Sequence, residues 1–284
     1  MQVSDLKKQI KIEEAAHASA QQQATLWIAL AEAYEEAADL ESAEDAFAHA
    51  IRLLRGTAAQ DLYTNALDGI AAIYFATGRA NTAERCLRQA VELEHTAGDS
   101  TAETIMRKDL AVALIAERKD TEAEEQASEA LRLLEAQADP NVGETILVYL
   151  THSRVLCEMR RCEEALQDVD RAEALAISKI GPNAVDIITI TAIRGMEQFS
   201  SGAVEQGEQT VQEALRLLDD RTDIPTSFQI GLRVRLLGEY SQLLGSAHRK
   251  RERKKVEEEI ARAKAQQPGC NGCTVSAASL ALFR

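Results

Sequence analysis

The stretch LWIALAEAYEEAADLESAEDAFAHAIRLL, residues 26–54, decides the fold. Its apolar residues recur every three or four positions on both sides of a break at Ala38 and Asp39, which predicts two amphipathic helices joined by a short turn. Ala31, Ala43 and Ala50 stand among larger apolar side chains. Because antiparallel helices that pack closely need small side chains where they cross, this arrangement predicts a tight helical hairpin.

Small residues recur at the same three positions in four later segments. They are Ala71, Ala111, Ser153 and Gly195 at the first position, Ala83, Ala123, Ala165 and Gly207 at the second, and Ala90, Ala130, Ala172 and Ala214 at the third. Equivalent positions fall at residues 34, 74, 114, 156 and 198, so the steps are 40, 40, 42 and 42 residues. Self-similarity at a nearly fixed period predicts a stack of repeated hairpins.

The composition favours an all-α fold. Hydrophobic residues make up 45% of the chain but aromatic residues only 4%, and Ala and Leu, the strongest helix formers, carry the apolar content. The chain has only 4 Pro, and runs of β-branched residues that would form strands are scarce. The central sheet of an α/β enzyme therefore has no source in this sequence.

The charge and the cysteines restrict the partners and the compartment. With 32 basic against 46 acidic residues, the formal net charge is −14, which disfavours nucleic acid and anionic membranes as partners. No run approaches the roughly 18 apolar residues of a membrane span, and the first residues lack the apolar core of a signal peptide. Five scattered Cys do not indicate a disulfide framework. We therefore expect a cytoplasmic protein without membrane insertion.

The first segment also contains seven residues in the order and spacing of a known signature: Trp27, Leu30, Ala31, Tyr34, Ala43, Phe47 and Ala50. They resemble the signature of the tetratricopeptide repeat family, with Ala31 where the family has Gly. The 40 to 42 residue step is similar to the long repeats of kinesin light chain and of many bacterial tetratricopeptide proteins. The resemblance implies an all-α, right-handed solenoid of about six antiparallel helix hairpins.

The repeat divides the chain into three parts. Residues 1–23 are expected to form a helical or flexible extension, and residues 266–284 a tail with a CxxC motif. The solenoid at residues 24–265 has repeats near 24–57, 64–97, 104–137, 146–179 and 188–221, followed by a degenerate polar cap at 230–265. Repeat five is the weakest, because Arg194 and Gln198 occupy positions that are normally apolar. Its register could be off by one.

The resemblance implies a function in protein binding. In this family the first helix of each hairpin lines a concave groove, so its outward positions should face a ligand. Those positions hold Ile28, Glu32, Glu35, Asn65, Asp68, Phe75, Lys108, Val112, Ile115, Leu150, Arg154, Met196, Phe199, Arg235 and Gln242. The predicted function is a non-enzymatic scaffold without a cofactor. It would bind a peptide segment or helix that has apolar anchors and acidic flanks, with Lys108 and Arg154 setting its register.

Other interpretations stay open. A peptide-sensing intracellular regulator would use the same repeats. Cys270 and Cys273 form a lone CxxC, the spacing of a half zinc site or of a redox pair, against the simpler view of an exposed tail with two thiols. His152, Cys157 and Cys162 are expected to fill the core, because residues five apart share a helical face poorly. No nucleotide-binding, hydrolase or metalloprotease motif is present, so we expect no catalysis.

The two ends of the solenoid differ in charge. Seven acidic residues precede the first basic residue of repeat one, Arg52, whereas residues 249–255 (RKRERKK) are strongly basic. Opposite charges at the two ends favour a weak head-to-tail association between copies of the chain.

Overall fold

The computed structural model describes residues 2–265, apart from the side chain of Ser227. Within that range the chain forms thirteen helices and no strand, which confirms the predicted all-α solenoid. The predicted CxxC tail, with Cys270 and Cys273, lies outside the described residues. No described helix is both long enough and apolar enough to cross a bilayer.

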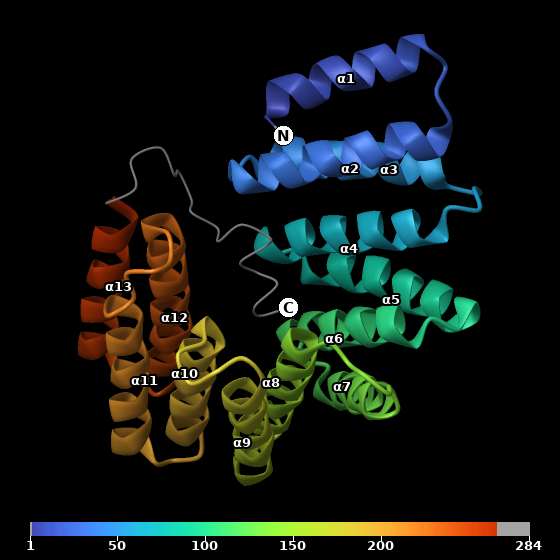
Figure 1. The fold of residues 1–284 in the computed structure, drawn as a ribbon. Coiled ribbons are helices and arrows are strands. Elements are labelled where there is room, and N and C mark those ends of the chain that lie inside the picture. The colour runs from blue at the N-terminus through green and yellow to red at the C-terminus, as the bar shows by residue number, and fades with distance from the viewer. Residues whose placement is uncertain (1, 266–284) are drawn as a thin grey trace.

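The helices pack as a stack of hairpins that curves around one open side (Figure 1). A single helix, α1 (Val3–Ala15), precedes the stack. The hairpins are α2 (Ala20–Glu36) with α3 (Leu40–Leu54), α4 (Gln60–Ala76) with α5 (Ala80–Ala97), α6 (Ser100–Ala116) with α7 (Asp120–Glu135), α8 (Val142–Glu158) with α9 (Cys162–Lys179), α10 (Val185–Ser200) with α11 (Val204–Asp219), and α12 (Thr226–Ser246) with α13 (Lys250–Ala265). In each pair we call the first helix the A helix and the second the B helix.

Every hairpin turns in the same way. One residue of each turn has a positive φ, between 58° and 100°: Ala38, Gly78, Arg118, Arg160, Gly202 and His248. The next residue donates its backbone N–H to the carbonyl oxygen five positions earlier, over 2.7–3.0 Å. This bond satisfies a carbonyl that the end of the A helix would otherwise leave unpaired. The sixth hairpin closes by this turn as well, although its sequence pattern is degenerate.

The small residues lie at the helix crossings, as their spacing predicts. Twelve alanines and Ser153 at the three positions are each no more than 1% exposed, and Gly195 and Gly207 are buried as well. A Cβ atom on Gly195 would lie 2.8 Å from the carbonyl oxygen of Gly207, and one on Gly207 would lie 2.5 Å from that of Gly195. The fifth hairpin is therefore in the predicted register, and only glycine fits its crossing.

The two polar residues that weaken the pattern of repeat five bond to neighbouring B helices. Arg194 pairs with Glu173 at 2.8 Å and with Asp170 at 2.5 Å, both on α9. Gln198 accepts a hydrogen bond from Thr210 on α11 at 2.8 Å. Polar contacts of this kind replace apolar packing without changing the register of the hairpin.

Each end of the stack carries a partly polar helix. Leu6 and Ile10 of α1 are buried, at 1% and 4% exposure, and join the core of the first hairpin. At the other end α13 buries only Val256 and Ala263. Terminal helices with a wet outer face close a solenoid core against water.

The cysteines differ from the sequence expectation. Cys157 and Cys162 form a disulfide, whereas Cys86 is free and half-buried. The prediction that Cys157 and Cys162 only fill the core was wrong because it treated them as residues of one helix. Cys157 lies near the end of α8 and Cys162 begins α9, so the turn between them reverses the chain and brings the two thiols together.

Candidate ligand-binding groove

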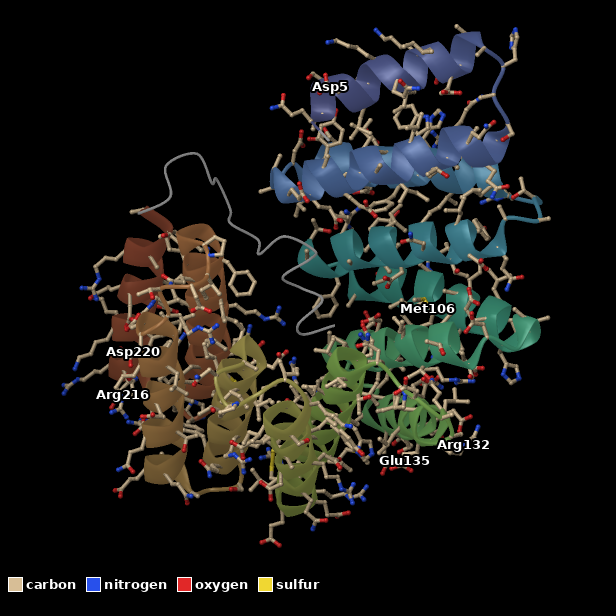
Figure 2. The ribbon with its side chains drawn as sticks, in the orientation of Figure 1. Asp5, Met106, Arg132, Glu135, Arg216 and Asp220 are labelled. Atoms are coloured by element: carbon tan, nitrogen blue, oxygen red, sulfur yellow. A yellow bond between two sulfur atoms is a disulfide. The ribbon has the colours of Figure 1, made fainter. Side chains whose placement is uncertain are left out.

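Two neighbouring cavities are lined mainly by A helices, one by α4, α6, α8 and α12 and the other by α8, α10 and α12. These helices border the open side of the curved stack in Figure 1. Arg154 of α8 and Glu239 of α12 line both cavities. We call this surface the concave groove. The exposed residues Arg132 and Arg216 lie on the B helices α7 and α11, which face away from it (Figure 2). The groove therefore belongs mainly to the A helices, as the resemblance implies.

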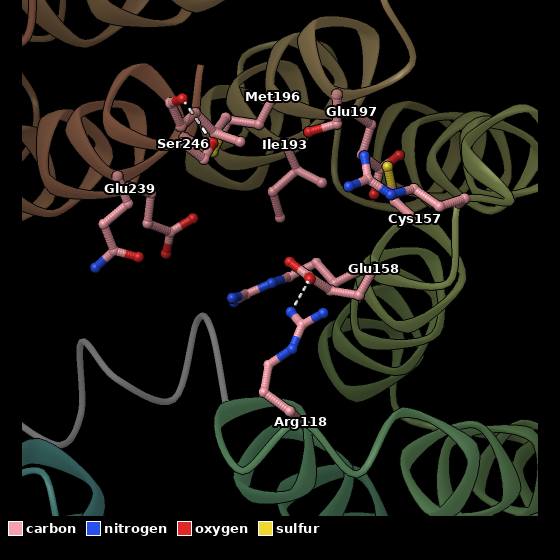
Figure 3. A pocket seen from close by; sticks show the side chains of 13 residues that line it. Arg118, Cys157, Glu158, Ile193, Met196, Glu197, Glu239 and Ser246 are labelled. Carbon is pink, nitrogen blue, oxygen red and sulfur yellow. Dashed lines mark hydrogen bonds and ion pairs between the residues drawn. The ribbon is translucent and has the colours of Figure 1, made fainter. Parts of the chain in front are cut away.

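The larger cavity, of about 370 Å³, is rich in charge (Figure 3). Its walls come from α8, α10, α12 and the turns after α6 and α8. The lining residues are Arg118, Arg154, Cys157, Glu158, Arg160, Ile193, Met196, Glu197, Ser200, Glu239, Gln242, Leu243 and Ser246. Three guanidinium groups and three carboxyl groups thus surround a short apolar wall, and the cavity can accept a charged group of a ligand.

The smaller cavity, of about 110 Å³, is mostly apolar. Its lining residues are Asp68, Ala71, Ala72, Phe75, Ala83, Leu87, Asp109, Val112, Ala113, Arg154, Arg235 and Glu239. Phe75 is 37% exposed and is one of only four large apolar side chains that are exposed among the described residues. An apolar site of this size suits a single large side chain of a ligand.

Arg154 differs from two other arginines inside the groove, Arg118 and Arg235. Arg118 forms an ion pair with Glu158 at 2.7 Å, and Arg235 lies 3.6 Å from Glu239. No side chain among residues 2–265 forms a hydrogen bond or ion pair with the guanidinium of Arg154. Since Arg154 lines both cavities, it is placed to bind an anionic group of a ligand that also enters the apolar cavity.

Burial shifts the pKa values of two groove residues in opposite directions. It raises the pKa of Glu197 to about 8, against the lowering influences of the Ser153 hydrogen bond and of Arg154. It lowers the pKa of Arg235 to about 10, an effect that the negative charge of Glu239 partly offsets. At neutral pH Glu197 is therefore mainly uncharged and Arg235 still carries its positive charge.

Seven of the predicted groove residues line the two cavities. They are Asp68, Phe75, Val112, Arg154 and Arg235 in the smaller cavity, and Arg154, Met196 and Gln242 in the larger. Sequence reasoning missed Arg118, Glu158, Glu197 and Glu239. Arg118 and Glu158 belong to hairpin ends rather than to outward helix positions. Glu197 directly follows the predicted Met196, and its polarity within an apolar stretch was the available signal.

Other predicted residues lie elsewhere. Lys108 is only 2% exposed, and its ammonium group lies 3.4 Å from Glu144 and 3.6 Å from Asp109. It is therefore buried among acidic partners and cannot set the register of a ligand. Seven more predicted residues line neither cavity. Four of them are buried, namely Ile28, Glu35, Leu150 and Phe199; two are exposed, Glu32 and Asn65; and one is half-buried, Ile115.

One polar cluster outside the groove has the residue types of a catalytic triad. Ser128 Oγ lies 3.3 Å from His152 Nε2, and His152 Nδ1 lies 2.6 Å from Asp168 Oδ2. Ser128 stands in the middle of α7, where backbone N–H groups bond along the helix and cannot stabilise an oxyanion. It also lines neither groove cavity. The cluster joins hairpins three and four, and it shows that His152 is not an apolar core filler.

The described residues offer no metal centre. Within residues 2–265, no three His, Cys, Asp or Glu side chains are grouped closely enough to hold a metal ion. The candidate metal ligands Cys270 and Cys273 lie outside that range.

Comparison with known proteins shows the fold. The sequence matches no protein-family model and no curated protein sequence. Among solved structures, BtubC from P. vanneervenii is 18% identical, with a TM-score of 0.64 over 79% of this chain and 93% of that one. The TPR-like repeats of a putative kinesin light chain from Podosopora anserina are 12% identical, with a TM-score of 0.56 over 70% and 96% of the two chains.

A regulatory protein is similar over a longer part of the chain. The Rap conjugation gene regulator of plasmid pLS20, solved in complex with the Phr* peptide, is 15% identical, with a TM-score of 0.58. The match covers 92% of this chain and 69% of the regulator. At these identities the similarity establishes architecture only. The chain has the fold of the tetratricopeptide-like helical solenoids.

Proposed function

We propose that this chain is a non-enzymatic scaffold that binds a peptide segment of a partner protein along its concave groove. A large apolar side chain of the peptide enters the cavity beside Phe75. An acidic group of the peptide pairs with Arg154. The observation that carries the proposal is the guanidinium of Arg154, which is unpaired within the described part of the chain and lies at the junction of an apolar and a charged cavity.

Three further observations support this function. The chain has a net charge of −14, yet the groove presents a cation, Arg154, that has no partner side chain among residues 2–265. Phe75 exposes apolar surface inside a cavity, where a ligand can bury it. The fold is also that of a regulator that was solved with a peptide bound.

A random peptide library displayed on phage tests the proposal with the full chain as bait. Selected peptides should share a large apolar residue near Asp or Glu. Phe75→Ala should weaken their binding about tenfold, since truncating an aromatic contact costs about 1.5 kcal/mol. Ile177→Ala is the matched control, because Ile177 is an exposed apolar residue of α9 outside both cavities. Equal binding by both variants would place the site elsewhere.

A second candidate is a peptide-sensing regulator in which peptide binding changes the curvature of the stack. The likeness to the pLS20 regulator, over 92% of this chain, favours it. Small-angle scattering should then show a change in the radius of gyration when a selected peptide saturates the groove. An unchanged scattering profile would leave the passive scaffold as the better description.

A further inference from the structure

A short chain of hydrogen bonds runs through the wall of the larger cavity. The hydroxyl oxygen of Ser153 lies 2.5 Å from Oε1 of Glu197 and 3.1 Å from the carbonyl oxygen of Leu150. A serine hydroxyl has one hydrogen and cannot donate to both acceptors. Both contacts are satisfied when Glu197 carries a proton on Oε1. The carboxyl group then donates to Ser153, and Ser153 donates to Leu150.

The other carboxyl oxygen of Glu197 gives an independent reason for the neutral form. Oε2 is buried and has no hydrogen-bond partner among the residues that the structure describes, and Glu197 is only 4% exposed. Placing an ionised oxygen there without a partner would be costly, whereas a neutral carbonyl oxygen costs much less. The geometry around both oxygens therefore agrees with a protonated Glu197.

Few charges act on this carboxyl group. The charged groups that act on it are Arg154 on α8, Asp168 on α9 and Arg194 on its own helix α10. The same cavity is also lined by the charged residues Arg118, Glu158, Arg160 and Glu239. Arg194 is already paired with two carboxylates of α9, and Asp168 is bound to His152 and Arg171. Arg154 is therefore the group whose charge an ionised Glu197 would neutralise.

We propose that Glu197 is a proton-dependent gate for an anion site at Arg154. With Glu197 neutral, Arg154 binds a carboxylate of the peptide ligand. With Glu197 ionised, its carboxylate pairs with Arg154 and excludes the ligand group. This inference deepens the proposed peptide-binding function and rests on it for the identity of the ligand.

The direction of the pH dependence follows from the pKa of Glu197, which burial raises to about 8. Ligand affinity should be constant below that pH and fall above it. For a single ionising group, one pH unit above the pKa leaves about a tenth of the molecules protonated, so affinity should drop about tenfold at about pH 9.

The first test needs no peptide. Carboxyl ¹³C NMR of the full chain follows the titration of Glu197, with Glu197→Gln identifying the signal. A midpoint near pH 8 is expected, and a midpoint near the ordinary value of 4.5 would overturn the proposal. Acetate serves as a carboxylate probe of the Arg154 Nε–H signal. It should bind more weakly at about pH 9.5 than at about pH 7 in the wild type, and equally at both in Glu197→Gln.

The second test uses a peptide selected from the phage library. In Glu197→Gln its affinity should stay constant up to about pH 9, because the amide can donate to Ser153 and never ionises. In Arg154→Gln the affinity for the peptide should fall by up to about tenfold. That affinity should no longer decrease as the pH rises above about 8. Glu205→Gln, which changes an exposed carboxylate of α11, is the control and should keep the wild-type profile.

The two tests separate the two proposals. Peptides that bind with an affinity independent of pH and of Glu197 would overturn the gate and leave peptide binding intact. Failure to select any peptide, with the NMR midpoint near 8 and acetate binding as expected, would remove the proposed function but keep the anion gate.

Discussion

The two cavities of the groove share Arg154 and Glu239 but differ in almost every other respect. The smaller one is walled by α4, α5 and α6, where alanines, Leu87 and Val112 pack in regular repeats. The larger one is walled by α8, α10 and α12, where the repeat pattern is degenerate and charged residues replace apolar ones. The regular half of the solenoid thus forms an apolar surface and the irregular half forms a charged one.

This difference shows where a repeat protein can acquire specificity. In the regular half each side chain has the packing role of its counterparts, so little freedom is left for recognition. In the irregular half, Glu197 and Ser153 form a buried polar contact between two hairpins. The curvature of the stack then places both surfaces around one ligand site.

The largest loss of stability is expected from a substitution at Gly207, where α11 crosses α10 in the wall of the charged cavity. In Gly207→Ala the new methyl group would lie 2.5 Å from backbone atoms of α10, which forces the two helices apart. We expect a loss of about 3 kcal/mol in the free energy of unfolding, measured by urea denaturation. Gly238→Ala is the control, because a Cβ atom at Gly238 meets nothing within 4 Å and should stabilise α12 by about 0.5 kcal/mol. Equal effects would contradict the close crossing.

The buried acid of the charged cavity should cost stability. Folding raises the pKa of Glu197 from 4.5 to about 8, so the folded chain retains a proton that the unfolded chain releases. The contribution of Glu197 to stability is therefore greatest below pH 4.5 and declines as the pH rises towards 8. Glu197→Gln should raise the free energy of unfolding by roughly 2–3 kcal/mol at about pH 7. The gain should vanish at about pH 4, and a gain that persists there would contradict this cause.

The disulfide lies in the wall of the charged cavity, since Cys157 lines that cavity. It closes a loop of only a few residues, so loop-closure entropy gives it about 2 kcal/mol of stabilisation. Adding a dithiol reductant should lower the melting temperature of the wild type and leave that of a Cys157→Ala, Cys162→Ala variant unchanged. Equal shifts in both would mean that the bridge does not form.

The smallest expected effect is a difference between the two cavities in how strongly added salt weakens peptide binding. Raising the ionic strength should weaken binding at Arg154 a few-fold, because added ions screen partly exposed charges. In Arg154→Gln the remaining binding depends on apolar burial beside Phe75 and should lose this sensitivity. Arg251→Gln, at an exposed position of α13, should keep it. Measurements of peptide affinity by fluorescence anisotropy would detect these changes.

The fold could be predicted because its determinants are local and repeated. Ala31, Ala43 and Ala50 and their counterparts mark each crossing at a constant spacing, and all are buried in the structure. The same reasoning placed Phe75 and Arg154 in the groove, since both follow the outward positions of their helices.

The remaining site residues depend on contacts between hairpins, which spacing alone does not reveal. Lys108 has a groove position in the pattern, but Glu144 of the next hairpin draws its ammonium group into the interior. The pKa of Glu197 is raised because burial disfavours its charged form, although Ser153, 44 residues earlier, bonds to it. The Cys157–Cys162 bridge depends on a turn that the helical period could not place.

The hairpin turn that recurs six times also has a mechanical consequence. Each turn is closed by a backbone bond between residues of the same hairpin, near Ala38, Gly78, Arg118, Arg160, Gly202 and His248. Only some of the joints between hairpins have a similar bond, such as the one from the Asp99 N–H to the Glu94 oxygen. The joints otherwise rely on side-chain contacts, which include the ion pairs of Arg79 with Glu44 and of Lys119 with Glu84. Under tension applied at the ends of the chain, the joints between hairpins should therefore open before any hairpin unfolds. The groove would widen as they open.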